Sequence, residues 1–311
     1  MLSKEQQAIV EDILMKKQQN PDEPLYLFLT GGAGTGKTFT TKAMYQGLLH
    51  LYNNAIDSHP DKVKGFLLAY TGKATYNIGG TTLHSALFIP FNKSTSNSLR
   101  SERLDVLTKE YQQLRLVLID EISLIGARML HCIDKRFREI MQTLTKHFGG
   151  LDIIFCGDLY QAEPIHDCLV FQAPTIDTDL LPYDFWQQLV KCFNLQTTMR
   201  QTDQLFVAAL NRIRMGSQTK EDIAYLNSKC LRTPPVDPMF PFLFYKRKDV
   251  DAHNQNILST LPGELLIINA IDEHNNTVPI EQLYKHSANL ANQIILKEDI
   301  LIEIYGGNYD I

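Results

Sequence analysis

The chain has 311 residues, of which 44% are hydrophobic and 21% are charged. This composition is typical of a globular protein with a sizeable core, in one large domain or two smaller ones, and it excludes a disordered or fibrous chain. The formal net charge of −5 excludes a global basic field, so any binding of nucleic acid has to use local grooves.

The charge and the cysteines carry further information. Residues 1–260 hold 28 Lys and Arg against 27 Asp and Glu, whereas residues 261–311 hold 2 against 8.

The five cysteines form no C-x-x-C pair, which argues against a disulfide framework or a zinc ribbon and indicates a reducing compartment. The N-terminus lacks a signal-peptide pattern and no run of about eighteen apolar residues occurs, so we expect neither secretion nor a membrane span.

Short apolar runs alternate with amphipathic stretches, which predicts an α/β fold with a parallel sheet. The predicted strands, in chain order, are residues 25–30, 65–71, 116–120, 152–156, 193–198, 242–245 and 264–269. The clearest helix is predicted over residues 127–148, where apolar side chains recur at helical spacing. The polar run 92–98 and the stretch that follows it to Gln113 predict an insertion between two strands, and the prolines of residues 173–182 predict a lobe boundary before Met199.

The most specific motif is a glycine-rich loop. Residues 31–38 read GGAGTGKT and satisfy G-x-x-x-x-G-K-[ST] directly after a predicted strand and before a helical pattern. Backbone N–H groups of such a loop surround phosphate oxygens, a lysine at the position of Lys37 reaches the terminal phosphates, and a hydroxyl at the position of Thr38 binds Mg²⁺. The predicted nucleotide-binding residues are Gly32, Ala33, Gly34, Thr35, Gly36, Lys37 and Thr38.

Acidic and polar side chains follow the later strands. Asp120 and Glu121 end a buried strand, at the place where phosphate-binding-loop enzymes hold Mg²⁺ and activate water. Glu121 favours hydrolysis of the nucleotide over transfer to a small molecule. Gln161 follows the next strand and is suited to contact a γ-phosphate, with a plain polar turn as the alternative. Arg200, at the lobe boundary, is suited to act as an arginine finger, with a solvated charge as the alternative.

Two more segments supply groups that suit the backbone of a nucleic acid. Thr71 lies in Y-T-G-K, and Thr82 and His84 lie in G-G-T-T-L-H-S, which together offer hydroxyls, backbone N–H groups and one imidazole. A packed or capping histidine remains the alternative for His84. Near the N-terminus, S-K-E-Q fits a capping box in which Gln6 reaches back to the backbone.

The ordered set of motifs resembles the Pif (petite integration frequency) family of superfamily 1B DNA helicases. In chain order, these motifs are LSKEQ, GGAGTGKT, YTGKAT with GGTTLHS, LVLIDEIS, IIFCGDLYQAEPI and TTMRQ. The resemblance runs from residue 2 to about residue 260. It implies a first RecA-like P-loop NTPase lobe over residues 1–195 and an incomplete second RecA-like lobe over residues 196–311. Residues 90–113 would then form a small wedge subdomain inserted in the first lobe.

The resemblance also implies a function. It implies movement 5′→3′ along single-stranded DNA, driven by ATP with Mg²⁺, with single-stranded DNA and DNA forks as partners and no membrane. Recombination, repair or telomere maintenance would be the setting, in the nucleus or alternatively in the mitochondrion. The implied roles are adenine contact for Gln6, phosphate and metal binding for Lys37 and Thr38, metal and water for Asp120 and Glu121, γ-phosphate sensing for Gln161 and Arg200, and DNA contact for Thr71, Thr82 and His84.

The sequence departs from the family pattern at two places. Ala162-Glu163-Pro164 follows Gln161 where the family usually has L-P-P, from which we expect reduced efficiency at most. The family's T-x-H-K-x-Q-G and later S-R segments have no counterpart before Ile311, so we expect a missing C-terminal segment or a partner to complete the second lobe. The isolated chain should therefore bind nucleotide better than it hydrolyses it. The alternatives are a non-translocating remnant that binds ATP and DNA, and an unrelated P-loop phosphotransferase or assembly ATPase.

Overall fold

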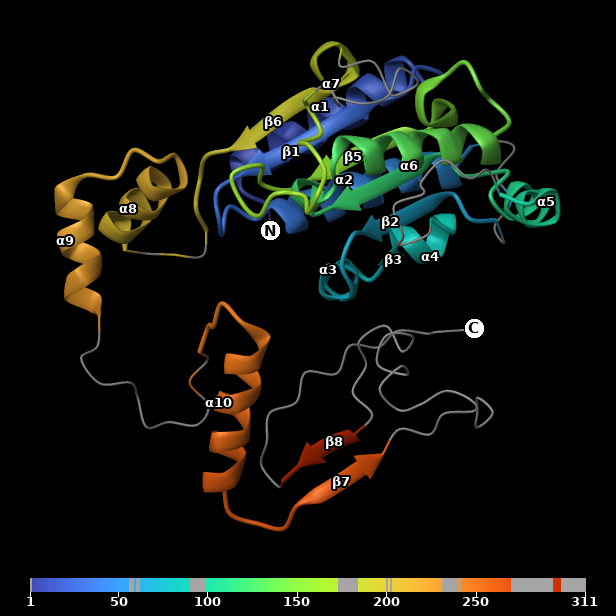
Figure 1. Ribbon diagram of the computed structural model, residues 1–311. Coiled ribbons are helices and arrows are strands. Elements are labelled where there is room, and N and C mark those ends of the chain that lie inside the picture. Colours follow the sequence, from blue (N-terminus) through green and yellow to red (C-terminus); the bar gives the residue numbers. More distant parts are fainter. Residues whose placement is uncertain are drawn as a thin grey trace. The chain divides into compact units, whose positions relative to one another are not determined.

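The computed structural model describes residues 2–55, 59, 62–89, 99–172, 184–199, 201, 203–230, 240, 242–269 and 293–297. The chain divides into two compact units, of which the first extends to Ser228 and the second begins at Lys229. Figure 1 shows the elements of both units. The predicted lobe division between residues 195 and 196 falls inside the first unit and stays a prediction.

The first unit is built on a six-stranded sheet in which all neighbouring strands are parallel, as predicted. The strand order is β3-β2-β4-β5-β1-β6. Because the strands are parallel, their C-terminal ends lie together at one edge, which we call the carboxyl edge; the opposite edge is the amino edge. The strands are β1 (Tyr26–Gly31), β2 (Gly65–Ala69), β3 (Thr81–Thr82), β4 (Leu116–Asp120), β5 (Asp152–Cys156) and β6 (Lys191–Leu195).

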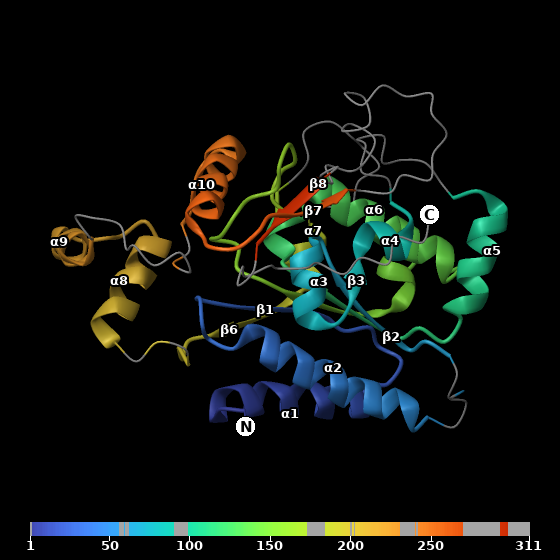
Figure 2. The ribbon, with the colours of Figure 1, turned by 90° about the horizontal axis from the view of Figure 1, so that it is seen from below.

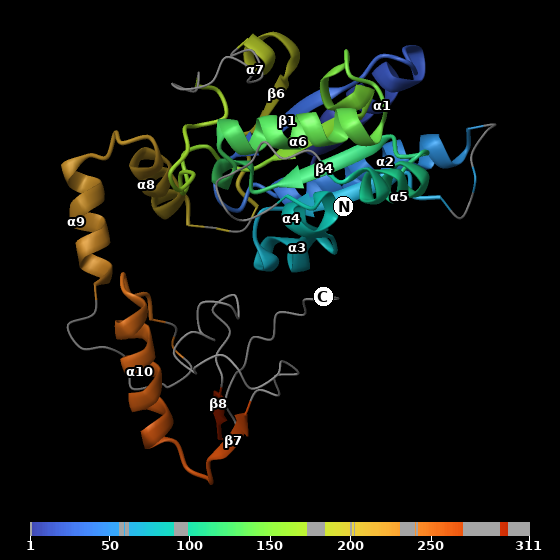
Figure 3. The same ribbon diagram turned by 45° about the vertical axis from the view of Figure 1, so that its right-hand side comes forward.

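Helices cover both faces of this sheet. On one face α1 (Lys4–Gln19) and α2 (Lys37–Asn53) lie side by side, as Figure 2 shows. On the other face lies α6 (Ala127–Ile140), and Figure 3 shows this helix lying along the sheet. Alternate strand residues enter the two layers, since Leu118 packs with α2 and Ile119 packs with α6. Burial on both faces explains why the central strands are continuous apolar runs in the sequence.

The remaining helices of the first unit are short. They are α3 (Gly72–Ile78), α4 (Leu83–Leu87), α5 (Ser101–Glu110), α7 (Asp184–Leu189), α8 (Gln204–Arg214) and α9 (Lys220–Lys229), whose last residue is the first of the second unit. The predicted insertion is described from residue 99 onward, where α5 packs against α6; residues 90–98 lie outside the described residues. Within the described ranges, no helix is both long and apolar enough to cross a membrane.

The helix predicted over residues 127–148 is shorter than predicted. It ends at Ile140, and Gln142 has a left-handed backbone with φ 52°. The carboxylate of Asp134 accepts the N–H of Phe148 at 2.5 Å, which fixes the returning chain, a short 3₁₀ helix, against α6. Phe148 is fully buried, whereas Leu144 is 69% exposed although its spacing matched the helical pattern.

The last strand of the sheet lies earlier in the chain than predicted. β6 spans Lys191–Leu195, where the sequence predicted residues 193–198. The strand pairs with β1 only as far as Leu195, which is buried. The next two backbone N–H groups, of Gln196 and Thr197, donate to the carboxylate of Glu5 and not to a strand. A side-chain acceptor on α1 thus ends the strand.

The second unit contains α10 (Arg247–Thr260) and an antiparallel pair, β7 (Leu266–Asn269) with β8 (Gln293–Leu296). β7 confirms most of the strand predicted over residues 264–269, and β8 was not predicted. The strand predicted over residues 242–245 is wrong, since these residues are irregular and Leu243 and Tyr245 are 100% and 99% exposed. A strand needs a neighbour for its backbone groups, and no strand of the described residues pairs with this segment.

Candidate nucleotide site at the carboxyl edge

The glycine-rich loop connects β1 to α2 at the carboxyl edge of the sheet. Gly36 caps α2 with φ 83°, and a Cβ at this position would lie 2.5 Å from Nε2 of Gln6, so the position requires glycine. The hydroxyl of Thr35 donates to the carbonyl of Gly32 at 3.0 Å and stabilises the curled loop. The loop thereby leads into the N-terminus of α2, where backbone N–H groups and the helix dipole favour an anion.

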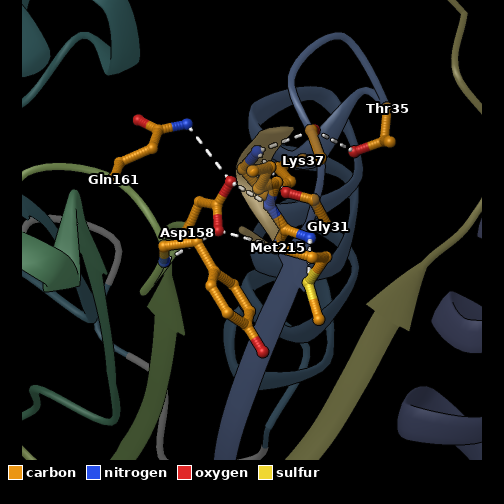
Figure 4. Close-up of polar contacts among 9 residues, drawn as sticks. Gly31, Thr35, Lys37, Asp158, Gln161 and Met215 are labelled. Atoms are coloured by element: carbon orange, nitrogen blue, oxygen red, sulfur yellow. Dashed lines mark hydrogen bonds and ion pairs between the residues drawn. The ribbon is translucent and has the colours of Figure 1, made fainter. Parts of the chain in front are cut away.

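Lys37 is the first residue of α2 and folds back over the loop. Its ammonium donates to the carbonyls of Gly31 at 2.9 Å and Gly32 at 3.1 Å, as Figure 4 shows for the lysine and the loop. Hydrogen bonds to the loop's own carbonyls can be exchanged for bonds to phosphate oxygens. Thr38 follows on the same turn of the helix and is half-buried.

The paired acids lie where β4 ends. Burial raises the pKa of Asp120, which is 7% exposed, although the N–H of Glu121 at 2.9 Å and the thiol of Cys156 donate to its carboxylate. Burial also raises the pKa of Glu121, and the negative charge of Asp120 raises it further. The positive charge of Lys37 opposes both pKa shifts. Glu121 has φ 54°, a left-handed conformation that is uncommon for glutamate and is often found at functional sites.

Gln161 lies in the turn that follows β5. The carboxylate of Asp158, which is 1% exposed, accepts the N–H of Tyr160 at 3.1 Å, and the N–H of Gln161 donates to the Asp158 carbonyl at 2.9 Å. The side-chain Nε2 of Gln161 lies 3.4 Å from Asp158 Oδ2, near the outer limit of a hydrogen bond. Figure 4 shows the exposed amide directed at this carboxylate.

A pocket of about 250 Å³ adjoins these residues. Glu121 and Gln161 line it from the sheet edge, and Thr71, Lys73 and Asn77 line it from α3 and the residue before that helix. The structure therefore brings the segment predicted to contact DNA next to the residues predicted to act on the nucleotide.

Gln6 joins α1 to the glycine-rich loop. The predicted capping box is confirmed, because the N–H of Ser3 donates to Gln6 Oε1 at 2.9 Å and the N–H of Gln6 donates to Ser3 Oγ at 3.2 Å. Gln6 Nε2 also donates to the carbonyl of Thr35 at 3.0 Å, and the side chain is 2% exposed. The contact with adenine stays a prediction.

The residues predicted to contact DNA begin two short helices. Thr71 caps α3 and Thr82 caps α4, each through a hydroxyl that accepts a backbone N–H three residues later. His84 is 6% exposed, its ring packs edge-on against Tyr70 with ring centroids 5.3 Å apart, and burial lowers its pKa. The packing supports the structural alternative for His84, while both threonines lie at the carboxyl edge.

One arginine of the site was not singled out from the sequence. Arg214, the last residue of α8, forms a two-pronged ion pair with Asp158, with Nε 2.8 Å from Oδ2 and Nη2 2.7 Å from Oδ1. Its guanidinium also lies 4.5 Å from the ring centroid of Tyr160. No local pattern could predict a pair between residues 56 positions apart. Arg200, the arginine that the sequence did favour, lies outside the described residues.

The comparisons with known proteins identify the family. Residues 1–222 match the sequence pattern of the PIF1-like helicase family. The chain belongs to this family. It is 32% identical to the ATP-dependent DNA helicase PIF1 of Saccharomyces cerevisiae (strain YJM789) over 280 residues, which are 87% of this chain and 30% of that protein.

Solved structures of this family share the fold. The crystal structure of Pif1 helicase from Candida albicans matches with a TM-score of 0.74 and 24% identity, over 96% of this chain and 63% of that one. Pif1 helicase from Bacteroides, in complex with ADP-AlF3 and ssDNA, matches with a TM-score of 0.63 and 25% identity, over 88% and 61% of the two chains. The family match over residues 1–222 confirms the predicted family, and the solved structures confirm the predicted α/β fold with a parallel sheet.

The matched relatives are longer than this chain. The chain spans 30% of the Saccharomyces cerevisiae PIF1, 39% of the Danio rerio PIF1 and 41% of the Saccharomyces cerevisiae helicase RRM3.

Proposed function

We propose that this chain is the nucleotide-binding part of an ATP-dependent DNA helicase. The observation that carries the proposal is the group of Lys37, Asp120, Glu121 and Gln161 at one edge of a parallel sheet, beside the N-terminus of α2. The relative from Bacteroides is described with ADP-AlF3 and ssDNA, which supports ATP as the nucleotide and single-stranded DNA as the partner. The name shared by the curated relatives supports hydrolysis coupled to unwinding.

The donors present suit Mg²⁺. The hydroxyl of Thr38 and the carboxylate of Asp120 are hard oxygen ligands, which Mg²⁺ prefers. Among the described residues, no group of three or more His, Cys, Asp or Glu side chains is arranged to hold a metal ion. Mg²⁺ usually keeps several waters and is held by one or two protein oxygens together with substrate phosphates. When bound, Mg²⁺ supplies positive charge that neutralises the phosphates during transfer.

The chain's own groups divide the chemical work. Lys37 exchanges the carbonyls of its loop for the terminal phosphates and stabilises the charge that develops there. Glu121 accepts a proton from the attacking water, and its raised pKa makes it a stronger base than an exposed glutamate. Gln161 contacts the γ-phosphate from the turn after β5, Arg200 contributes positive charge from the segment after β6, and Gln6 contacts the adenine.

DNA is proposed to bind across α3 and α4. Thr71 and Thr82 present hydroxyls and helix N-termini at the same edge as the nucleotide, and the pocket between Thr71 and Glu121 gives a short connection between the two ligands. Residues 1–195 would form the first lobe and residues 196–311 part of the second. We propose movement 5′→3′ on single-stranded DNA and at forks, in recombination, repair or telomere maintenance, in the nucleus or the mitochondrion.

Hydrolysis of ATP with and without single-stranded DNA tests this function. We expect DNA to stimulate hydrolysis, and Lys37→Ala to lower it by about 10²-fold or more. Lys16→Ala, which removes a lysine from an exposed pair on α1, is the matched control and should hydrolyse ATP like the wild type. A chain that binds ATP through Lys37 but hydrolyses none, with or without DNA, would support the non-translocating alternative. Hydrolysis that survives in Lys37→Ala would exclude the proposed site.

A further inference from the structure

Two arginines of α8 form the same kind of bond with two different aspartates. Arg212 binds Asp222 with distances of 2.7 and 2.5 Å, and this pair lies within the α8–α9 hairpin. Arg214 binds Asp158 with distances of 2.8 and 2.7 Å and so connects α8 to the turn after β5. Asp222 and Asp158 are 4% and 1% exposed. The two ion pairs therefore have the same chemistry but connect α8 to different parts of the chain: Arg212 to α9, and Arg214 to the turn after β5.

The carboxylate of Asp158 is shared between Arg214 and the turn that carries Gln161. Oδ1 accepts from the N–H of Tyr160 at 3.1 Å and from Arg214 Nη2, and Oδ2 accepts from Arg214 Nε at 2.8 Å and lies 3.4 Å from Gln161 Nε2. Burial acts to raise the pKa of Asp158, but the hydrogen bonds from Arg214 and from the N–H of Tyr160, together with the charges of Arg214 and Lys37, outweigh it and hold the pKa below its usual value. Asp158 is thus an ionised buried carboxylate whose main partner is Arg214.

α8 also approaches the phosphate-binding loop. A Cβ built on Gly32 would lie 3.1 Å from Oδ1 of Asn211. Asn211 and Arg214 are three residues apart, and side chains at this spacing lie on one face of a helix. The same face of α8 therefore meets the glycine-rich loop and the turn of Gln161.

From these contacts we infer that Arg214 is a positioning residue that leaves the amide of Gln161 available to a γ-phosphate, an inference that rests on the proposed function. A buried carboxylate without a partner would draw the nearest remaining donor to itself, because an unpaired buried charge is costly. Without Arg214, Asp158 would keep only the N–H of Tyr160, and Gln161 Nε2 is the other group of the turn that lies within hydrogen-bond distance of its carboxylate. With Arg214 in place, the long Gln161 contact can be given up at little cost when a phosphate oxygen is offered.

The arrangement couples the γ-phosphate to α8. When Gln161 leaves Asp158 for a phosphate oxygen, Arg214 no longer shares Oδ2 of that carboxylate with Gln161 and holds α8 more firmly. Because coupling between two binding events is reciprocal, firm docking of α8 in turn favours a nucleotide that has a γ-phosphate over one that lacks it. ADP, which cannot engage Gln161, should be insensitive to Arg214.

The test compares the affinity of the full chain for ADP with its affinity for a non-hydrolysable ATP analogue, both with Mg²⁺. The wild type should prefer the analogue. Arg214→Met should reduce this preference by about fivefold or more while ADP affinity is kept, since the coupling between sites is typically of this size. Arg212→Met, the matched control on the same helix, should keep the wild-type preference. Arg214→Met with Asp158→Asn removes the stranded charge and should recover part of the preference.

The outcomes separate the inference from the proposed function. An Arg214→Met chain with wild-type preference, or a double variant as impaired as Arg214→Met, would overturn the role of Arg214. Arg214→Lys, which keeps the charge, should retain more of the preference than Arg214→Met. If the methionine variant does not fold, the lysine variant is tested in its place. A complete loss of the preference in Arg214→Lys would also contradict the inference. A wild type that binds neither nucleotide would contradict the proposed function itself and this inference with it.

Discussion

Charged side chains at the two edges of the central sheet have different kinds of hydrogen-bond partners. At the amino edge, Asp152 is 2% exposed and accepts hydrogen bonds from Lys17 Nζ at 3.0 Å, from the N–H of Leu25 at 2.8 Å and from the hydroxyl of Tyr52. At the carboxyl edge, Lys37 donates to the exchangeable loop carbonyls of Gly31 and Gly32, and burial raises the pKa of the neighbouring acids Asp120 and Glu121.

The difference separates structure from chemistry. The partners of Asp152 are fixed by the fold, so removing one of them leaves an uncompensated buried charge and lowers the stability of the folded chain. Lys37 instead donates to carbonyls of the glycine-rich loop and can exchange them for a ligand, so the carboxyl edge can bind and react. Substitutions at the amino edge should therefore lower the free energy of unfolding, whereas substitutions at the carboxyl edge should impair nucleotide binding or hydrolysis.

The largest effect is expected at the carboxyl edge. Glu121→Gln keeps the size of the side chain but removes the base, so ATP hydrolysis should fall by about 10²–10⁴-fold while ATP binding is kept. Steady-state hydrolysis and equilibrium binding, measured on the same sample, check this. Glu102→Gln on the exposed face of α5 is the control. Equal losses of binding and hydrolysis in Glu121→Gln would show that Glu121 holds the nucleotide and does not act on water.

At the amino edge the expected effect is on folding. Lys17→Met leaves the buried Asp152 without its cationic partner, so the free energy of unfolding should fall by about 3–5 kcal/mol, with ATP affinity of the folded protein unchanged. Urea denaturation measures the change. Lys16→Met, one residue away in an exposed pair, should unfold like the wild type. Lys17→Met with Asp152→Asn should recover part of the loss, and no recovery would mean that packing of the lysine chain accounts for it.

The pH dependence of the same variant sharpens this comparison. Burial raises the pKa of Asp152, and the charge of Lys17 is the largest factor that opposes the shift. A folded-state pKa above the unfolded one makes stability fall as pH rises from the ordinary aspartate pKa through the raised value. Lys17→Met raises that pKa further, so its deficit in unfolding free energy should be larger at about pH 8 than at about pH 5. An equal loss of unfolding free energy at the two pH values would show that Lys17 does not lower the pKa of Asp152.

The smallest effect concerns the cap of α1. Ser3→Ala removes the hydroxyl that accepts the N–H of Gln6, so the unfolding free energy should fall by about 1 kcal/mol. Ser3→Asp retains a capping oxygen and should lose less. Thermal or urea denaturation distinguishes the two variants, and indistinguishable stabilities would mean that the bond from Gln6 to the carbonyl of Thr35 holds the helix start by itself.

The sequence was informative where chemistry is encoded locally. Lys37, Asp120, Glu121 and Gln161 each follow a buried strand within a short motif, and parallel pairing brings the ends of those strands to one edge. The central strands could be predicted because burial on both faces makes them uniformly apolar. The edge strand β6 was misplaced because it begins with the polar Lys191, so that no continuous apolar run marks its bounds.

The remaining features depend on contacts between distant residues. Arg214 reaches Asp158 over 56 positions and Lys17 reaches Asp152 over 135, and neither pair leaves a local pattern. The end of α6 was missed because Asp134 and the buried Phe148 turn the chain back onto the helix, against a helical periodicity that continues to Leu144. Such turns are decided by tertiary packing.

The central claim is that a nucleoside triphosphate binds over the glycine-rich loop with Lys37 on its phosphates. The most direct measurement is an isothermal titration of the full chain and of its Lys37→Ala variant with a non-hydrolysable ATP analogue and Mg²⁺. We expect the wild-type chain to bind one molecule of analogue at saturation and the variant to show no binding under the same conditions. A wild-type chain without affinity, or a variant that binds as tightly as the wild type, would contradict it.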